Sequence, residues 1–594
     1  MEIQTSWNLE QLGKNKENLK EELSNLKQKA ISFSQKWKSK NFTENPQILK
    51  QALDEYEKLQ TEISAGGNLG IYFWLLKEKE QANTDAKANF NLINETNVEI
   101  ANELNFFELK LSKLEQKKQD EFLNPPELKE YLNFIKRIFR AEKHTLSEKE
   151  ETLFALKSGT AYENWKGMLP KLLSTEEREI EFNGKTEKKN FEELLNLMKD
   201  KNKSTRDAAA KAFNEILKKY EDISEIEINS ILENKKTNDK IRNYSRPDES
   251  RHISDDVESE IVDALISAVS ENFSIPKEFY RLKTKLLGLE KLEYHERNVH
   301  YGEIKDTYDS EKASELTKKA LQNLDPQFSE IFESFLENGQ IDFYPMKGKR
   351  PGAFCVWFGK DKPVFVMLNH ANTLDNTLTI AHEMGHAINA ELSKKQNSLQ
   401  FEIPTSTTET ASTFMEDFVL KEILKTANEE TKLAIMMQKL NDDITTIFRQ
   451  IACYKFEQEL HEKFRKKGYL SKEEIGIIFQ RHMSSYMGEF VEQSPGSENW
   501  WVYWGHIRAY FYNYSYAFGL LISKALQKMV NENPEKIKQV KEFLSAGSSD
   551  SPKNIFKKLG IDITKKEFWL SGIKEVQKLL KETESLAKKL KKIE

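Results

Sequence analysis

The sequence predicts a mainly α-helical protein with a small β-hairpin beside one histidine-bearing helix. Apolar residues recur at helical spacing along most of the chain, for example over residues 48–63. Residues 350–369 differ, because two runs of β-branched and aromatic residues flank a turn-rich break. An apolar stretch with two histidines four residues apart, His382 and His386, follows this hairpin directly. These three observations define the predicted fold class.

The composition limits the kinds of partner that the chain can have. With 90 basic and 96 acidic residues among 594, the net charge of -6 argues against a nucleic-acid surface spread over the chain. Only two cysteines occur, Cys355 and Cys453, so neither a disulfide framework nor a Cys-based zinc site is expected. No run approaches the roughly 18 apolar residues of a membrane span. We expect a cytoplasmic protein, monomeric or weakly homo-oligomeric, without membrane or nucleic-acid partners.

The first part of the chain reads as a helical lobe. Amphipathic patterns cover residues 8–120, interrupted by glycine- and proline-containing breaks near residues 66 and 125. A coiled-coil arm is the alternative interpretation, but the heptads do not persist over three or four repeats. Alternating residues around Asn183-Gly184 then predict a short hairpin. We place a domain boundary just after it, which gives domains 1–190 and 191–594.

The predicted hairpin at 350–369 has one edge that a ligand could use. Gly352 permits close approach of another backbone, such as an extended peptide that adds a strand to the sheet edge. Gly352, Ala353 and Phe354 are therefore candidate substrate-binding residues. The alternative is that the hairpin is only part of the core.

Residues 382–386 spell His-Glu-Met-Gly-His, the H-E-x-x-H zinc pattern. Histidines four apart on a helix project from one face, so His382 and His386 can reach one metal ion. Glu383 can then act as general base on a metal-held water. Thr373 or Asp375 is available to cap this helix.

A catalytic zinc needs a third protein ligand. The three-histidine pattern H-E-x-x-H-x-x-G-x-x-H is excluded, because positions 389 and 392 are Asn and Leu. The other common solution is a glutamate on a following helix. Pro404 and a Ser/Thr run predict that a new helix begins near 405–408, with Glu409 in its first turn. On spacing alone three other glutamates stay open, namely Glu391, Glu402 and Glu416.

Glu416 has a second possible role. It lies seven residues after Glu409 and roughly on the same helix face, so it could accept a hydrogen bond from the other ring nitrogen of a ligand histidine. A further pair, His295 and His300, is a weaker metal candidate. Five residues of separation rotate the two side chains by about 140° on a helix, so a loop or strand is favoured there.

Residues 350–420 resemble the M3 family of zinc metallopeptidases, the thimet oligopeptidase group, and most closely its oligoendopeptidase F branch. That family has H-E-x-G-H followed by a helix of the form E-x-x-S-x-x-x-E, which is similar to residues 382–386 and 409–416 here. The segment Lys349-Arg-Pro-Gly-Ala-Phe354 is also similar to a family pattern. The resemblance selects Glu409 as the third zinc ligand and implies one Zn²⁺ per chain.

The resemblance continues near the C-terminus, over residues 506–519. The family's histidine-and-tyrosine segment contacts substrate and stabilises the oxyanion, and matching by position carries over four residues, His506, Tyr512, Tyr514 and Tyr516. This chain departs from the branch pattern at Ala509 and Tyr510, so the identity of the oxyanion donor stays open. Tyr512 and Tyr516 are four apart, which on a helix turns both the same way and Tyr514 elsewhere. We favour Tyr516 and then Tyr512, with Tyr514 as a substrate-binding residue; a purely structural aromatic cluster is the alternative.

The family resemblance implies a two-lobed helical enzyme that encloses a deep channel, with residues 191–594 as the catalytic domain. It implies a zinc endopeptidase that hydrolyses short unstructured oligopeptides. Two alternatives remain: a helical peptide-binding or scaffold protein with a vestigial metal site, and an endoprotease that acts on folded proteins.

Overall fold

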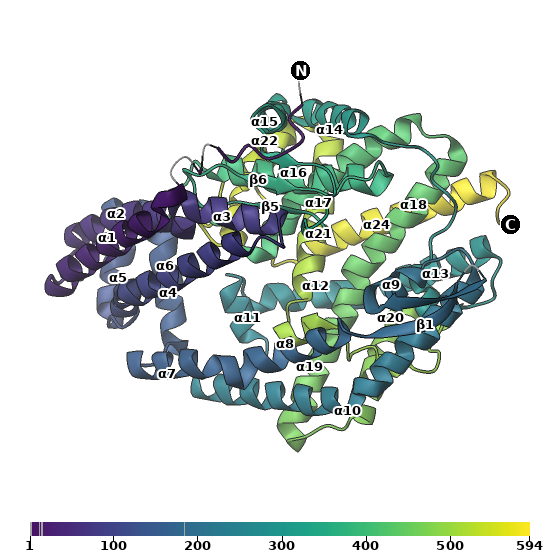
Figure 1. The fold of residues 1–594 in the computed structure, drawn as a ribbon, viewed down its shortest axis with the longest axis horizontal. Helices are drawn as coiled ribbons and strands as arrows, with labels where there is room; N and C mark the ends of the chain where they lie inside the picture. Colours follow the sequence, from purple (N-terminus) through teal and green to yellow (C-terminus); the bar gives the residue numbers. More distant parts are fainter. Residues whose placement is uncertain (1–2, 11, 14–15, 183) are drawn as a thin grey trace. The chain divides into compact units, whose positions relative to one another are not determined.

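The computed structural model describes residues 3–10, 12–13, 16–182 and 184–594, and the fold is mainly helical with three small sheets (Figure 1). The predicted fold class is confirmed in this respect. The chain forms two compact units, each built from three segments. Unit 1 comprises residues 1–143, 306–426 and 529–561, and unit 2 comprises residues 144–305, 427–528 and 562–594. The predicted boundary near residue 190 does not coincide with a limit of either unit and stays a prediction.

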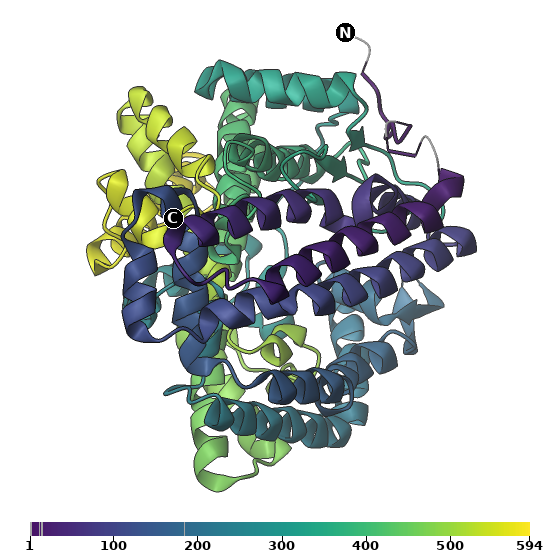
Figure 2. The same cartoon turned by 90° about the vertical axis from the view of Figure 1, so that its left-hand side faces the viewer.

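Unit 1 begins with long amphipathic helices whose apolar faces meet in one cluster. Helix α1 packs against α4 and α2, and the two views show these helices lying lengthwise together (Figures 1 and 2). Their shared core includes stacked rings of Phe42, Tyr56 and Phe107. The elements are α1 (Leu19–Ser39), α2 (Pro46–Ile63), α3 (Gly67–Lys79), α4 (Thr84–Ser112), α5 (Gln116–Leu123) and α6 (Leu132–Ala141).

The rest of unit 1 surrounds one buried helix, α16 (Leu374–Ser393). This helix packs on α17 (Thr405–Thr426), on α14 (Ser310–Leu324), α15 (Pro326–Glu337) and α22 (Ile537–Leu544), and on two strands. A helix contacted on so many sides must be apolar on more than one face, which explains its Ala- and Ile-rich sequence. Helix α23 (Pro552–Lys558) also belongs to unit 1.

The predicted hairpin at 350–369 is present and belongs to a three-stranded sheet. β5 (Phe354–Val356) pairs antiparallel with β6 (Phe365–Met367), with Cys355 opposite Val366. β4 (Ile341–Asp342), which no pattern in the sequence predicts, pairs with β6 in parallel. The order β4-β6-β5 leaves β5 at the edge of the sheet. That edge position is the one that strand addition by an extended peptide needs.

Unit 2 is organised around the 39-residue helix α10 (Lys203–Ile241). The predicted hairpin near residue 184 is confirmed, with β1 (Glu177–Phe182) antiparallel to β2 (Lys185–Asn190) and Phe182 opposite Lys185. Its turn residue Asn183 lies outside the described residues, whereas Gly184 has φ of 74°, as a tight turn requires. β3 (Leu292–Glu293) and β7 (Val491–Glu492) form a short parallel pair.

The remaining helices of unit 2 are α7 (Glu148–Ser158), α8 (Asn164–Leu173), α9 (Phe191–Leu197), α11 (Glu249–Ser254), α12 (Ser259–Glu271), α13 (Ser274–Leu287), α18 (Glu429–Asp443), α19 (Gln450–Lys467), α20 (Lys472–Met487) and α24 (Lys566–Lys589). Helix α21 (Tyr514–Glu532) begins in unit 2 and ends in unit 1. In the described part of the chain, every helix is too short or too polar to cross a lipid bilayer.

Candidate metal centre

Helix α16 presents His382 and His386 on one face. Thr373 caps the helix, because its hydroxyl oxygen accepts a hydrogen bond from the Asn376 N–H at 3.2 Å. The two imidazole rings are one turn apart, with centroids separated by 5.1 Å and planes at 82°. Both Nε2 atoms are thus directed to the same side of the helix, as the four-residue spacing predicts.

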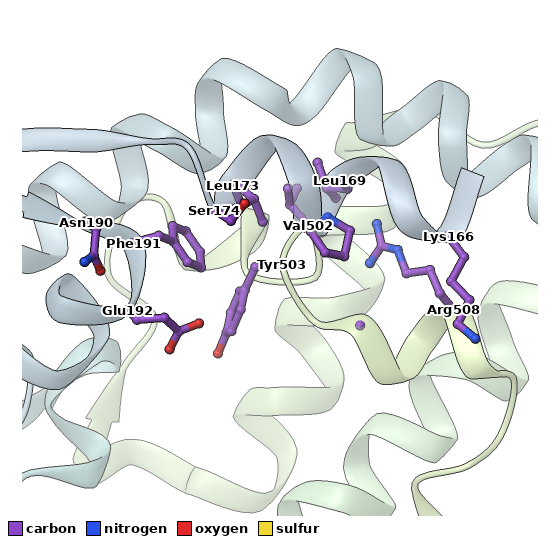
Figure 3. Close-up of a pocket in the computed structure, with 12 residues that line it drawn as sticks. Lys166, Leu169, Leu173, Ser174, Asn190, Phe191, Glu192, Val502, Tyr503 and Arg508 are labelled. Carbon is purple, nitrogen blue, oxygen red and sulfur yellow. The ribbon is translucent and has the colours of Figure 1, made fainter. Parts of the chain in front are cut away.

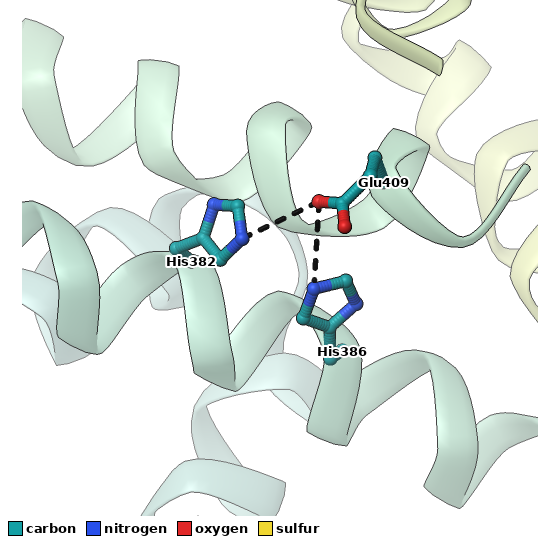
Figure 4. A group of neighbouring side chains, drawn as sticks. All are labelled: His382, His386 and Glu409. Atoms are coloured by element: carbon teal, nitrogen blue, oxygen red, sulfur yellow. Dashed lines mark ion pairs between the residues drawn. The ribbon is translucent and has the colours of Figure 1, made fainter. Parts of the chain in front are cut away.

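Glu409, in the first turns of α17, completes a group of three possible ligands. One carboxylate oxygen, Oε2, lies 3.3 Å from His382 Nε2 and 3.5 Å from His386 Nε2. Figure 4 shows both imidazoles turned toward this carboxylate. Ser412 donates a hydrogen bond of 2.8 Å to the same oxygen and so orients the Glu409 side chain. The structure therefore brings together the three residues of the predicted ligand set.

The donor chemistry of this group fits Zn²⁺. Two imidazole nitrogens and one carboxylate oxygen are ligands that zinc takes in catalytic sites, where a fourth position stays open. The ligand atoms of the three residues all lie within 4.8 Å of one another. The other ring nitrogen of His382, Nδ1, lies 3.3 Å from Glu416 Oε2, the position predicted for Glu416. His386 Nδ1 is buried without a hydrogen-bond partner among the described residues.

The electrostatics of the group favour a cation. Burial opposes a positive charge on His382, but hydrogen bonds with Glu409 and Glu416 raise its pKa to about 10. Burial likewise opposes the charge of Glu409, yet hydrogen bonds with His382 and His386 hold its pKa well below the usual range. The carboxylates thus place negative charge at the imidazoles, and a divalent cation is stabilised by the same field.

Glu383 lies between the two histidines in sequence and is buried. Its carboxylate accepts a hydrogen bond from the backbone N–H of Cys355, and burial raises its pKa. Because Cys355 is in β5, this bond ties the edge strand to the histidine helix. The general-base candidate is therefore oriented by the strand that is predicted to receive a peptide.

The residues predicted to bind substrate before β5 have different surroundings. Gly352 is exposed with φ of 83°, and its carbonyl accepts a 2.6 Å hydrogen bond from Asn369. Ala353 is half-buried and directly precedes the strand. The Phe354 ring instead packs against Trp7 and Trp74. Any contact of Phe354 with a peptide would therefore use its backbone.

Three of the four predicted oxyanion and substrate residues form a cluster in unit 2. His506 Nε2 lies 2.8 Å from the Tyr516 hydroxyl, and the His506 ring stacks on Tyr512 at 5.8 Å. Tyr512 and Tyr516 are edge to face at 5.4 Å. Tyr514 differs, because it is fully buried and its hydroxyl donates to Asp255 at 2.7 Å. This burial argues against the predicted contact of Tyr514 with substrate and gives the side chain a structural role.

The helical argument for pairing Tyr512 with Tyr516 is wrong, although the two rings do meet. Helix α21 begins only at Tyr514, so Tyr512 precedes it. The residues just before Tyr512 form a turn and not a helix. Tyr510 has φ of 46° and Phe511 has φ of 58°, both unusual for residues with side chains. The buried Glu457 accepts a 2.8 Å hydrogen bond from the Phe511 N–H, and burial raises the pKa of Glu457 to about 8. Nothing in the local sequence indicates this hydrogen bond between Glu457 and Phe511.

A cavity of about 430 Å³ lies in unit 2, where α8 and the start of α9 face the loop before His506 (Figure 3). Asn190, Phe191 and Glu192 stand at one end of the labelled group, Lys166 and Arg508 stand at the other, and Tyr503 lies between them (Figure 3). The Arg508 guanidinium is paired with buried Glu227 at 2.6 Å. The cavity therefore combines an apolar wall with a neutralised cation, and Gly505 in its lining directly precedes His506.

A second group with metal-ligand atoms in unit 2 comprises Asp207, His295 and Glu296. His295 and Glu296 lie on a short 3₁₀ turn, Tyr294–Asn298, rather than on an α-helix, in line with the predicted loop. Arg206 donates to Glu296 at 2.6 Å, and Lys203 pairs with Asp207 at 3.0 Å. These side-chain cations already neutralise both carboxylates, so the group serves as an ion-pair network.

Comparison with known proteins places the chain in a family. The profile of Peptidase family M3 matches residues 196–575, and that of Oligopeptidase F matches residues 110–168. The chain therefore belongs to peptidase family M3, in its oligopeptidase F branch. An oligoendopeptidase F homolog of Borreliella burgdorferi is 25% identical over 571 residues and 94% of each chain. Oligopeptidase PepF of Bacillus subtilis is 24% identical, covering 100% of this chain and 88% of its own length.

Solved structures share the fold. A Chlamydophila abortus protein superposes with a TM-score of 0.86 at 22% identity, covering 98% of both chains. Oligoendopeptidase-F from Enterococcus faecium gives a TM-score of 0.69 at 20% identity, covering 98% of this chain and 99% of its own. At these identities the likeness concerns the fold.

Proposed function

We propose that this chain is a zinc-dependent endopeptidase that hydrolyses short unstructured oligopeptides. One observation carries the proposal: His382, His386 and Glu409 converge on one point, and Glu383 lies beside it on the same helix. Membership of peptidase family M3 supports this reading, as do relatives that are named oligopeptidases. His382, His386 and Glu409 would hold one zinc ion per chain.

The proposed chemistry is hydrolysis by a polarised water. Bound zinc supplies a Lewis acid for the carbonyl oxygen and lowers the pKa of water toward neutrality. Glu383 takes a proton from the attacking water, whose oxygen forms a bond to the peptide carbonyl carbon. The same carboxylic acid then passes the proton to the leaving amine as the C–N bond breaks. The Glu383–Cys355 hydrogen bond holds the carboxylate for both transfers.

The backbone edge of β5 is the proposed binding element for the peptide. An extended chain can pair with those N–H and C=O groups on this edge that Glu383 does not already occupy, which suits cleavage of many short sequences because main-chain bonds carry little side-chain preference. Tyr516 is the proposed donor to the developing oxyanion, and His506 is its hydrogen-bond partner. Loss of one such donor costs about 10²–10³ in rate in other hydrolases.

The test compares Glu383→Gln with Glu391→Gln on the same helix. Glu383→Gln should keep one zinc per chain, as measured by inductively coupled plasma mass spectrometry. The same variant should no longer cleave a mixed peptide library. Glu391, which pairs with Lys394 at 2.7 Å, should tolerate the change in both assays. Normal cleavage by Glu383→Gln would overturn the proposal, and loss of zinc in Glu391→Gln would overturn the ligand assignment.

Two further outcomes separate the alternatives. Wild-type protein that contains zinc and binds peptides without cleaving them would be a binding protein with a vestigial site. Digestion of folded proteins at rates similar to those of short peptides would identify a general endoprotease. We expect cleavage of short peptides only.

A further inference from the structure

The hydrogen bonds of His506 form a short chain with a fixed direction within unit 2. Trp504 Nε1 donates to His506 Nδ1 at 3.2 Å, and His506 Nε2 lies 2.8 Å from the Tyr516 hydroxyl oxygen. An indole N–H can donate a hydrogen bond but cannot accept one. His506 Nδ1 must therefore be the acceptor in its bond with Trp504.

This acceptor role decides which ring nitrogen of His506 carries the hydrogen. Burial lowers the pKa of His506, and the positive charge of Arg449 lowers it further, so the ring is neutral near pH 7. A neutral imidazole carries one N–H, and with Nδ1 accepting, that hydrogen lies on Nε2. His506 then donates to Tyr516, and the hydroxyl oxygen of Tyr516 accepts.

A tyrosine and a histidine left to themselves favour the opposite direction. The phenol hydroxyl is a stronger acid than the N–H of a neutral imidazole, so O–H···N is the stronger bond of the two. The indole of Trp504 occupies the only other acceptor position of the ring and reverses this preference. As a result the hydroxyl hydrogen of Tyr516 is not spent on His506.

We propose that Trp504 is a positioning residue that fixes the Nε2–H tautomer of His506, so that the Tyr516 hydroxyl can donate to the carbonyl oxygen of a peptide as it becomes an oxyanion. The role of Trp504 rests on the proposed peptidase function. It also separates the two candidate tyrosines, because His506 Nε2 is hydrogen-bonded to Tyr516, whereas Tyr512 contacts the His506 ring by stacking.

The surroundings of Trp504 hold its indole in place. Its side chain is 5% exposed and lies edge to face against Phe479. The Arg449 guanidinium lies over the ring, 4.0 Å from its centroid. A cation at this position draws electron density from the indole and makes its N–H a stronger donor. Arg449 Nε has no hydrogen-bond partner in the part of the chain that the structure describes, so the aromatic face is a principal contact of this cation.

The test uses Trp504→Phe, which keeps an aromatic ring and removes the indole N–H, in the full-length zinc protein. Trp500→Phe is the matched control, because Trp500 is equally buried and its Nε1 donates to Asn214 at 3.0 Å, away from His506. The tautomer is read from ¹⁵N shifts of histidine-labelled protein without substrate, with His506→Gln to assign the signals. Steady-state kinetics on one peptide give kcat and KM.

We expect wild type and Trp500→Phe to show the Nε2–H tautomer. Trp504→Phe should populate the Nδ1–H form and lose about tenfold or more in kcat, up to the roughly 10²–10³-fold cost of a missing oxyanion donor. Its KM should stay within about twofold, because the effect arises in the transition state. Adding Tyr516→Phe should lower kcat by a smaller factor in the Trp504→Phe variant than in wild type.

An Nε2–H tautomer retained in Trp504→Phe, or a changed tautomer with unchanged kcat, would overturn the proposal. Equal losses in Trp504→Phe and Trp500→Phe would likewise show a general packing effect and reject the assignment. A wild-type chain that cleaves no peptide would reject the proposed peptidase function separately, because the tautomer is measured without substrate.

Discussion

The backbone of Ala411 leaves no space for a side chain on Gly385. A Cβ atom at Gly385 would lie 2.6 Å from the carbonyl oxygen of Ala411, a distance that real Cβ atoms essentially never show. Gly385 directly precedes His386, and Ala411 follows Glu409 by two residues. The close approach of α16 and α17 at this point therefore sets how far the carboxylate stands from the imidazoles.

Gly385→Ala should weaken both the fold and the metal site. The added methyl group must push the helices apart at a backbone atom, which cannot rotate away, and overpacking of this kind costs about 1–3 kcal/mol. Because Glu409 moves with α17, zinc affinity should fall as well. Denaturant unfolding and zinc titration against a chelator measure the two effects.

Gly167→Ala is the control for that substitution. Gly167 is also helical, in α8, and a Cβ there meets nothing within 4 Å. Helix propensity alone then favours alanine, by up to about 1 kcal/mol. Zinc affinity should be unchanged, and a loss equal to that of Gly385→Ala would contradict the packing argument.

Glu416→Gln should lower zinc affinity about 10–100-fold while one zinc still binds at saturation. The carboxylate lies 3.3 Å from His382 Nδ1, where it orients the ring and makes its other nitrogen a better ligand. Glu422→Gln on the same helix is the matched control, since Glu422 pairs with Lys425. Competition with a fluorescent chelator measures both, and equal affinities for the two variants would remove this role of Glu416.

Substitutions of Tyr512 and Tyr516 should differ in their effects on kcat. Tyr516→Phe should lower kcat by about 10²–10³ with little change in stability, as expected for a lost oxyanion donor. Tyr512→Phe should lower kcat less, because its ring contact with His506 survives. A larger kcat loss for Tyr512→Phe than for Tyr516→Phe would reverse the assignment.

Tyr514→Phe should act on the fold. The substitution removes the donor to buried Asp255 and should cost about 1–3 kcal/mol in free energy of unfolding. At saturating peptide the residual folded enzyme should keep its kcat. A kcat loss like that of Tyr516→Phe, at unchanged stability, would restore Tyr514 as a substrate contact.

The buried side chain of His252 should make the folded protein less stable in acid. This fully buried ring bonds the Tyr454 hydroxyl and Ser259, and burial lowers its pKa to about 4. In the unfolded chain His252 takes up a proton near pH 6.5, whereas in the folded protein it does so only near pH 4. The free energy of unfolding is therefore highest above pH 6.5 and falls as the pH drops toward 4, by about 3 kcal/mol in total. Urea unfolding of His252→Gln should show a smaller fall across this range, whereas exposed His300→Gln should follow wild type.

Much of unit 1 near the metal centre follows from local sequence. The H-E-x-x-H spacing, the Thr373 cap and the Ser/Thr start of α17 depend on residues a few positions apart, so periodicity and capping rules predict them. The pairing of β4 with β6 does not, because two residues are too few for a strand pattern. Choosing Glu409 over Glu402 likewise needed the family resemblance.

The parts of unit 2 that were missed depend on contacts distant in sequence. Glu457 bonds the Phe511 N–H from 54 positions away, and no turn signal marks the left-handed conformation at Tyr510. The Tyr512–Tyr516 contact was expected for the wrong reason, since that turn rather than a helix brings the rings together. No pattern in the sequence indicates that the Trp504 N–H bonds His506.

The histidine helix of unit 1 contacts a segment that the ribosome synthesises much later. Asn389 and Ser393, at the end of the histidine helix, both donate to the carbonyl of Leu544, a residue 155 positions after Asn389. At about 5–20 residues per second, a ribosome adds Leu544 roughly eight to thirty seconds after Asn389. During that interval the nascent helix has uncovered apolar faces and no final partner for Asn389. Unit 1 is thus completed only after its last segment, residues 529–561, has been synthesised.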